Sequence, residues 1–185
     1  MSQTSSSKIN TGRVDALFVG RGKAVRKEDC ALIEVRPEGI VGDRHAGALK
    51  KADSRDSGIP RGTMIRNWRQ WSAVATEEMA VIAAGLNLAL LDGALLGPNL
   101  IVSGIENFTK LPSGTLLRFP EAVLFVEAEN DPCTHAGKAV KLENADVDPN
   151  RFVKAALGRR GLVGTVHSPG MIRVGDIVEV ILPSN

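Results

Sequence analysis

The sequence predicts a mainly β protein, a closed or nearly closed β-barrel with a few short helices. Eight short runs rich in β-branched and aromatic residues are separated by Gly, Pro and Asn, as expected for strands joined by tight turns. Helical spacing of apolar residues is confined to two or three segments. The length of 185 residues fits one domain. Many short strands with few inserted helices are typical of a barrel.

The expected elements follow from these patterns in chain order. Strands are predicted over 14–19, 31–36, 71–75, 100–103, 115–119, 123–128, 162–166 and 176–182. Helices are predicted over 77–84 and 149–157, with a third, short helix over 138–144. Thr76 is the expected N-cap of the first helix and precedes two glutamates, while Asp148-Pro149 form an N-cap and N1 pair.

Composition and local signals bound the class of protein. The chain is 43% hydrophobic and 24% charged, which excludes a wholly disordered chain. Residues 1–12 are polar and Ser-rich, so we expect a disordered tail there and a single barrel domain over 13–185. No apolar run approaches the ~20 residues of a membrane span, and the N-terminus lacks the apolar core of a secretory signal. We therefore expect a cytoplasmic protein with no membrane partner.

Charge is concentrated in one window. The formal net charge is only +2, which gives no overall argument for nucleic-acid binding, and none is expected. Between positions 44 and 71, however, basic residues far outnumber acidic ones. This window predicts an anion site, and the alternative is a solvated basic loop. The polar stretch 50–60 lacks periodicity, so we expect a structureless binding loop there.

The segment Gly42-Asp43-Arg44-His45 is the first candidate site. Glycine lets backbone N–H groups approach a ligand closely, and the guanidinium group is a planar donor for phosphate or carboxylate. Asp43 could orient Arg44 or His45. The alternative is a glycine-rich turn in which Asp43 and Arg44 form a structural ion pair. The segment is not a P-loop, because no Gly-Lys-Ser/Thr follows.

Cys133 is the second candidate. It follows the expected strand 123–128 and a polar exit, so we expect it at the mouth of the barrel. His135 could favour the thiolate form or carry a proton, and the thiolate attacks sulfur donors and binds soft metals. The alternative is a buried structural cysteine, which is our interpretation of Cys30. Zinc is disfavoured because no Cys-x-x-Cys or second histidine pair is present.

Two further motifs have a functional and a structural interpretation. Arg66 and Arg69, with Trp68 and Trp71, could clamp a flat anionic ligand, or the tryptophans could pack beneath the basic loop. Asn99, in a Gly-Pro-Asn turn, could bind a ligand or only close the turn.

In their order and spacing these segments resemble the MOSC family, named for the C-terminal domain of molybdenum cofactor sulfurases. The matching parts are Gly42 to His45, 69–78, the run Leu-Gly-Pro-Asn-Leu-Ile-Val-Ser-Gly at 96–104, the strand leading to Cys133, and the closing segments at 161–180. The resemblance spans roughly 14–182, nearly the whole chain.

The resemblance implies a MOSC-like barrel that handles sulfur or the molybdenum cofactor (molybdopterin). The family's cysteine, proposed in relatives to carry a persulfide or to ligate molybdenum, corresponds to Cys133, which is thus the implied metal ligand. The family's Gly-Glu-Asn segment corresponds to 97–99, where Pro98 replaces the glutamate, so a role of that glutamate has no counterpart here. Pyridoxal phosphate is not expected, because this chain is too short to include the sulfurases' desulfurase domain.

Three hypotheses follow. In the first, the protein binds molybdenum cofactor through Cys133, as part of a small oxidoreductase system or as a sulfur carrier, with the arginines and Asn99 holding the cofactor. In the second, Cys133 is only a persulfide shuttle, with a desulfurase as donor and no bound metal. In the third, the protein is a non-catalytic module that recruits a desulfurase or reductase partner through its barrel surface.

Overall fold

The computed structural model describes residues 10–184. The strands are β1 (Asn10–Val19), β2 (Glu28–Cys30), β3 (Leu32–Arg36), β4 (Gly39–Ile40), β5 (Leu49–Lys51), β6 (Met64–Arg66), β7 (Trp71–Ala75), β8 (Leu100–Ser103), β9 (Leu116–Arg118), β10 (Val123–Glu129), β11 (Leu162–Ser168), β12 (Gly170–Arg173) and β13 (Ile177–Ile181). The helices are α1 (Thr76–Gly85), α2 (Thr134–Glu143) and α3 (Pro149–Ala156), with short 3-10 helices η1 (Gly93–Leu96) and η2 (Phe108–Lys110).

Seven strands form a closed barrel, which confirms the predicted fold class. The order is β13-β9-β10-β11-β7-β8-β1, and β1 pairs with β13 to close the ring, with Asn10 opposite Val180. Strand β2 adds to the outer side of β1, and β3, β4 and β12 form a separate small sheet. The pairs within the ring are antiparallel except β7–β8, which is parallel because α1 and η1 lie between these two strands in the chain.

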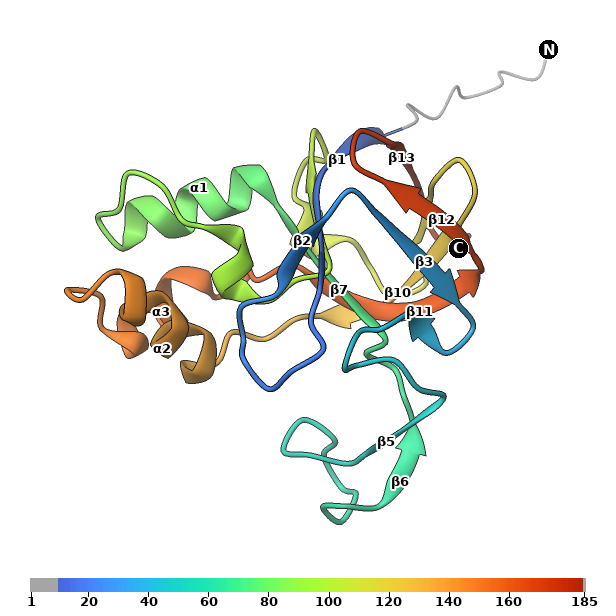
Figure 1. The fold of residues 1–185 in the computed structure, drawn as a ribbon, viewed down its shortest axis with the longest axis horizontal. Coiled ribbons are helices and arrows are strands. Elements are labelled where there is room, and N and C mark those ends of the chain that lie inside the picture. Colours follow the sequence, from blue (N-terminus) through green and yellow to red (C-terminus); the bar gives the residue numbers. More distant parts are fainter. Residues whose placement is uncertain (1–9, 185) are drawn as a thin grey trace.

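Two apolar cores hold the molecule together. The barrel interior is filled by alternating strand residues, such as Leu124 and Val126 of β10, which are fully buried between half-buried neighbours. The second core lies where the three helices pack together on one side of the barrel (Figure 1), around Ile82, Val140 and Phe152. The residues at the junction of the barrel and the helices therefore lie between the barrel core and the helical core.

The helix predictions are confirmed at two places and corrected at others. Helix α3 begins as expected, because the Asp148 carboxylate accepts from the Asn150 N–H at 2.9 Å. Thr76 is not the N-cap of α1, since its hydroxyl donates to Asp15 and α1 has no side-chain cap. The expected short helix 138–144 is longer and begins at Thr134, directly after Cys133.

The polar window also holds structure that sequence patterning missed. Strands β5 and β6 form a two-stranded ribbon that projects from the barrel (Figure 1). Both faces of the ribbon are largely exposed, so its residues show no alternation of apolar and polar side chains. The Asp56 carboxylate fixes the connecting loop by accepting from the Asp53 N–H and from Trp68 Nε1, both at 2.8 Å. The expected structureless loop over 50–60 is therefore an ordered turn.

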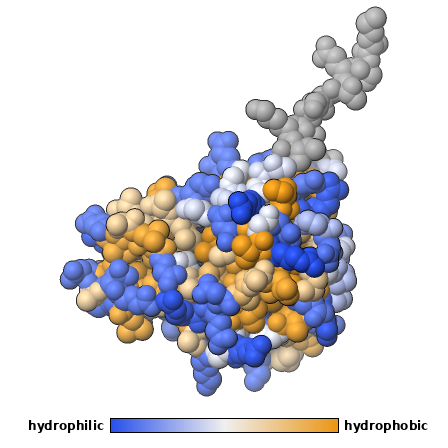
Figure 2. Space-filling model, turned by 45° about the horizontal axis from the view of Figure 1, so that its top comes forward, coloured by the Kyte–Doolittle hydropathy of each residue, from blue (hydrophilic) through white to orange (hydrophobic). Residues whose placement is uncertain are grey.

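At the N-terminus, strand β1 begins at Asn10, so residues 10–12 of the expected tail belong to the barrel. Residues 1–9 lie outside the described part. Within residues 10–184, no helix combines the length and apolar character needed to cross a bilayer. Apolar and polar side chains are intermixed over the face shown in Figure 2.

Candidate functional site

A cavity of about 200 Å³ brings most of the predicted site residues together. It lies between the barrel and the helices, where β10 ends and α2 begins. The predicted residues that line it are Arg44, His45, Arg69, Cys133 and His135, and the sequence analysis did not assign Arg55, Asn130 and Arg160, which also line it. Arginines from four separate segments thus surround one cysteine.

Cys133 occupies the N-cap position of α2, four residues beyond the end of β10. Its side chain is half-buried and packs against the helical core. The helix has no side-chain cap, so its first-turn N–H groups face the cavity end without a side-chain acceptor. The positive end of a helix dipole favours a negative charge. Cys133 therefore lies between the end of β10 and the first turn of α2, where it lines the cavity.

Arg160 is the most unusual residue of the cavity. It is only 7% exposed. One terminal nitrogen, Nη2, donates to the Leu96 carbonyl, while Nη1 is buried and has no hydrogen-bond partner among the described residues. Burial lowers the pKa of Arg160 to about 10, and the Coulombic interaction with Cys133 opposes that shift. The side chain therefore stays charged at neutral pH, and its buried Nη1 has no acceptor within residues 10–184.

Arg69 lines the same cavity and is partly held in place. Its Nη2 donates to Asn130 Oδ1 at 2.8 Å, and its guanidinium group lies 5.0 Å from the Trp68 ring centroid. Burial, followed by repulsion from Arg55, lowers the pKa of Arg69 to about 10. Because a guanidinium has five N–H donors, most of this group's donors remain available to a ligand.

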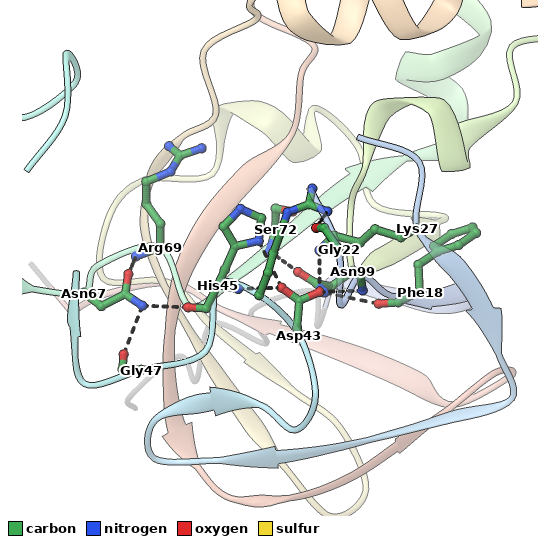
Figure 3. Close-up of polar contacts among 12 residues, drawn as sticks. Phe18, Gly22, Lys27, Asp43, His45, Gly47, Asn67, Arg69, Ser72 and Asn99 are labelled. Atoms are coloured by element: carbon green, nitrogen blue, oxygen red, sulfur yellow. Dashed lines mark hydrogen bonds and ion pairs between the residues drawn. The ribbon is translucent and has the colours of Figure 1, made fainter. Parts of the chain in front are cut away.

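Asp43 is at the centre of a network of polar contacts (Figure 3), next to His45, which lines the cavity. Its Oδ2 accepts from the Gly20 N–H at 3.0 Å and the Asn99 amide at 2.8 Å, and lies 2.8 Å from Lys27 Nζ in a fully buried ion pair. Its Oδ1 accepts from the His45 N–H at 2.9 Å and lies 3.0 Å from Nδ1 of the same residue. Five contacts thus satisfy one carboxylate.

The titration of the Asp43–Lys27 pair reflects this environment. Burial alone would raise the pKa of Asp43, but the hydrogen bond from His45 and the Lys27 charge hold it well below its ordinary value. Burial lowers the pKa of Lys27 to about 8, and Asp43 opposes that shift. The carboxylate therefore fixes the His45 ring and its turn, with the ring partly exposed at the cavity.

Arg44 does not form the ion pair with Asp43 that the alternative interpretation described. Its Nη1 donates to the carbonyls of Gly22 at 3.1 Å and Ala24 at 2.6 Å, while Lys27 takes the place beside Asp43. Arg44 thereby joins its own loop to the loop between β1 and β2, and still lines the cavity. Gly42 precedes this turn with a φ of 80°, a conformation that glycine adopts without strain.

Four predicted binding residues, Gly42, Asp43, Arg66 and Asn99, are not among the residues that line the cavity. Arg66 makes a bidentate ion pair with Glu127 on the barrel wall, at 2.8 and 3.0 Å. Asn99 is fully buried and bonds to Asp43, to the Phe18 carbonyl and to the Ser72 N–H, so it supports the site from beneath. Both side chains have their polar groups engaged by the protein, so a ligand-binding role for either of them stays a prediction.

The contacts of Trp68 and Trp71 favour a structural role for both residues over a clamp for a flat anionic ligand. Trp71 is 1% exposed in the barrel core, and its Nε1 donates to the Thr165 carbonyl at 2.8 Å. Trp68 supports the β5–β6 loop through Asp56. Cys30 packs partly buried against the barrel core, as predicted, and burial raises the pKa of its thiol.

Arg160 and Lys27 were missed for different reasons. Arg160 stands in the run Gly158-Arg-Arg-Gly161, and both glycines have positive φ, so paired arginines in a glycine turn were an available signal. Lys27 has no local signal, because its partner is distant in the sequence. Among residues 10–184, no group of three or more His, Cys, Asp or Glu side chains is arranged to hold a metal ion. Cys133 as a metal ligand therefore stays a prediction.

Comparison with known proteins identifies the class. The family model of the MOSC domain matches residues 42–179. The chain is also 36% identical over 173 residues to a Bacillus subtilis (strain 168) protein, covering 92% of this chain and 90% of that one. That relative bears the name "Putative metal-sulfur cluster biosynthesis proteins YuaD". The chain described here belongs to the MOSC family.

Solved structures agree with this assignment. The crystal structure of the YuaD protein from Bacillus subtilis superposes with a TM-score of 0.91 at 35% identity, covering 94% of this chain and 97% of that one. YiiM from Geobacillus stearothermophilus matches with a TM-score of 0.63 at 14% identity, over 92% of this chain and 75% of that one. At that identity YiiM supports the barrel fold alone.

Proposed function

We propose that this MOSC protein is a sulfur carrier in metal–sulfur cofactor chemistry, with Cys133 as the group that accepts and passes on a sulfur atom. The observation that carries the proposal is the placement of Cys133 at an uncapped helix N-terminus, in one cavity with Arg160, whose buried Nη1 has no acceptor within residues 10–184. The name of the YuaD relative, which refers to metal-sulfur cluster biosynthesis, supports the same area of chemistry.

The chemistry needs a thiolate and a place for the sulfur it receives. A thiolate attacks the outer sulfur of a donor persulfide, and the donor thiolate leaves. The product on Cys133 is a persulfide, which is again an anion. Arg160 and Arg69 lie around the same cavity with unused donors, and a charged donor to an anion makes a strong hydrogen bond. The two arginines would thus stabilise the negative charge on Cys133 before the transfer, as a thiolate, and after it, as a persulfide.

Binding of the molybdenum cofactor through Cys133 is the second candidate. The donor chemistry fits, since a thiolate is a soft ligand and the buried Nη1 of Arg160 suits a phosphate or another anion. When bound, the cofactor would supply a metal centre for redox chemistry, and Cys133, Arg69 and Arg160 would hold it. The cavity of about 200 Å³ is smaller than the ~300–1,000 Å³ common for organic ligands, so the carrier function is preferred.

A non-catalytic recruiting module makes a different prediction about Cys133. The desulfurase or reductase partner would then bind the barrel surface, and Cys133→Ser would leave that binding intact. A module that only recruits a partner does not require a cysteine surrounded by four arginines. We therefore assign the partners a different role, as donor and acceptor of the sulfur atom held on Cys133.

The test is direct loading of the thiol. The reduced full chain is incubated with inorganic polysulfide, and peptide mass spectrometry then locates any added sulfur atom. We expect the addition on Cys133, its release as thiocyanate by cyanide, and loss of loading in Cys133→Ser with retention in Cys30→Ser. Loading on Cys30 alone would overturn the proposal. Stoichiometric molybdenum in freshly purified protein, with no cyanide-labile sulfur, would favour the second candidate instead.

A further inference from the structure

We propose that the cavity accepts a small sulfur oxyanion, thiosulfate, as a direct donor of sulfur to Cys133. The inference rests on the proposed carrier function and adds a substrate class to it. The cavity holds the features of a site for a small, doubly charged anion.

The first feature is charge. Four arginines line the cavity, namely Arg44, Arg55, Arg69 and Arg160, against a single carboxylate, Asp131. The acidic partners of these arginines are few. Arg55 is paired with Asp53 at 3.1 Å, but Arg44 donates to carbonyls and Arg69 to an amide. Positive charge therefore remains in excess in a partly enclosed space, where screening by solvent is reduced.

The second feature is a pair of donor groups without acceptors among the described residues, one on Arg160 and one at the start of α2. Nη1 of Arg160 is buried, has no partner within residues 10–184, and belongs to a side chain that lines the cavity. A buried charged donor without an acceptor is costly unless a ligand supplies one. The ten-residue helix α2 adds its uncapped first turn on the Cys133 side. The two observations are independent, and both indicate an anion.

The third feature is size. A volume of about 200 Å³ is small for a nucleotide or pterin but sufficient for an anion of two sulfur and three oxygen atoms. The whole anion, including the outer sulfur atom that reacts with Cys133, can therefore be enclosed in the cavity. A sulfur oxyanion therefore matches both the charge and the volume.

The reaction balances without an added oxidant or reductant. The Cys133 thiolate attacks the outer sulfur of thiosulfate and forms a new S–S bond. The bond between the outer and central sulfur atoms breaks, and its electron pair leaves with sulfite. The products are the Cys133 persulfide anion and the sulfite dianion, so total charge is conserved and no proton moves. Arg160 and Arg69 would bind the oxyanion end, on which charge grows as sulfite departs.

The experiment compares two sulfur sources on the same purified chain. Thiosulfate loading is followed by sulfite release and by the added sulfur atom on Cys133, and polysulfide loading is measured in parallel. We expect wild type to load from both. Arg160→Gln should slow thiosulfate loading about ten- to a hundredfold, the loss expected for one charge-assisted hydrogen bond, and Arg160→Lys should retain part of the rate. Arg66→Gln, on the barrel wall, is the matched control and should react as wild type.

The outcomes separate this proposal from the one on which it rests. Loading by polysulfide but not by thiosulfate would overturn the thiosulfate donor and leave the sulfur carrier intact. Failure with both reagents would overturn the carrier as well. Equal thiosulfate rates in wild type and Arg160→Gln would overturn the assigned anion site. If Arg160→Gln does not fold, sulfate titrated into wild type replaces it: sulfate should compete with thiosulfate, and absence of competition would contradict the site.

Discussion

Asp43 and Arg160 are both charged, both almost fully buried and both beside the Cys133 cavity, yet their polar atoms are satisfied to different degrees. Asp43 receives four hydrogen-bonding contacts and an ion pair with Lys27. Arg160 has one carbonyl acceptor and one nitrogen without any partner among the described residues. The difference divides the charged residues of this site into two kinds: a carboxylate with all its contacts made stabilises the fold, and an arginine with an unused donor is the candidate for binding a ligand.

The same division applies to the other arginines. Arg66 uses both ends of its guanidinium fork on Glu127, outside the cavity, whereas Arg69 makes one side-chain hydrogen bond, to Asn130, inside it. Basic charge in the sequence is therefore a poor guide to binding by itself. The number of unused donors, which depends on distant partners, decides which arginines are available to a ligand.

Asp43→Asn should have the largest effect on stability. The substitution leaves the Lys27 ammonium buried without a counter-charge, and removing one partner of a buried ion pair costs about 3–5 kcal/mol. Urea unfolding measures this loss. The double variant Lys27→Met/Asp43→Asn should recover a large part of it, because no charge is then stranded. Additive losses in the double variant would show that the two residues do not act as a pair.

Acid should weaken the protein through the same network. The folded-state pKa of Asp43 lies below its ordinary value of 3.8, so its contribution is fully present above that pH and is lost as pH falls further. Thermal unfolding between pH 5 and about 2 should show a steeper loss in wild type than in Lys27→Met/Asp43→Asn. Parallel curves for the two proteins would contradict the assignment of Asp43 as a depressed carboxylate.

The barrel was predictable because it depends on local patterns. Alternating apolar residues, turn residues and the Asp148-Pro149 helix start are read from neighbours in the chain, and the structure confirms the closed barrel and two of the helices. The β5–β6 ribbon was not predictable in this way, since neither of its faces is buried in a core. Its strands are recognised by their pairing to each other, which local periodicity does not encode.

The site was predictable in its motifs but not in its roles. Local chemistry singled out Cys133 and the Gly42–His45 segment, and the cavity contains the cysteine with Arg44 and His45. Asn99 was expected at a ligand, but its amide bonds Asp43 across 56 positions of the chain. The buried position of Arg160 depends on the packing of its glycine turn against η1, where the Leu96 carbonyl accepts from the guanidinium group. Such long-range partners follow from the tertiary fold, so single-sequence patterns leave them undetermined.

Arg160→Met should have the smallest effect on stability, and so tests the comparison most sharply. The substitution removes a buried charge with an open donor, which is favourable, and deprives the Leu96 carbonyl of its donor, which is unfavourable. These effects oppose one another, so we expect a free energy of unfolding within about 1 kcal/mol of wild type. Urea unfolding beside Asp43→Asn gives the measurement. A loss as large as that of Asp43→Asn would mean that Arg160 is a structural charge, and the division between saturated and open groups would fail at the residue on which it most depends.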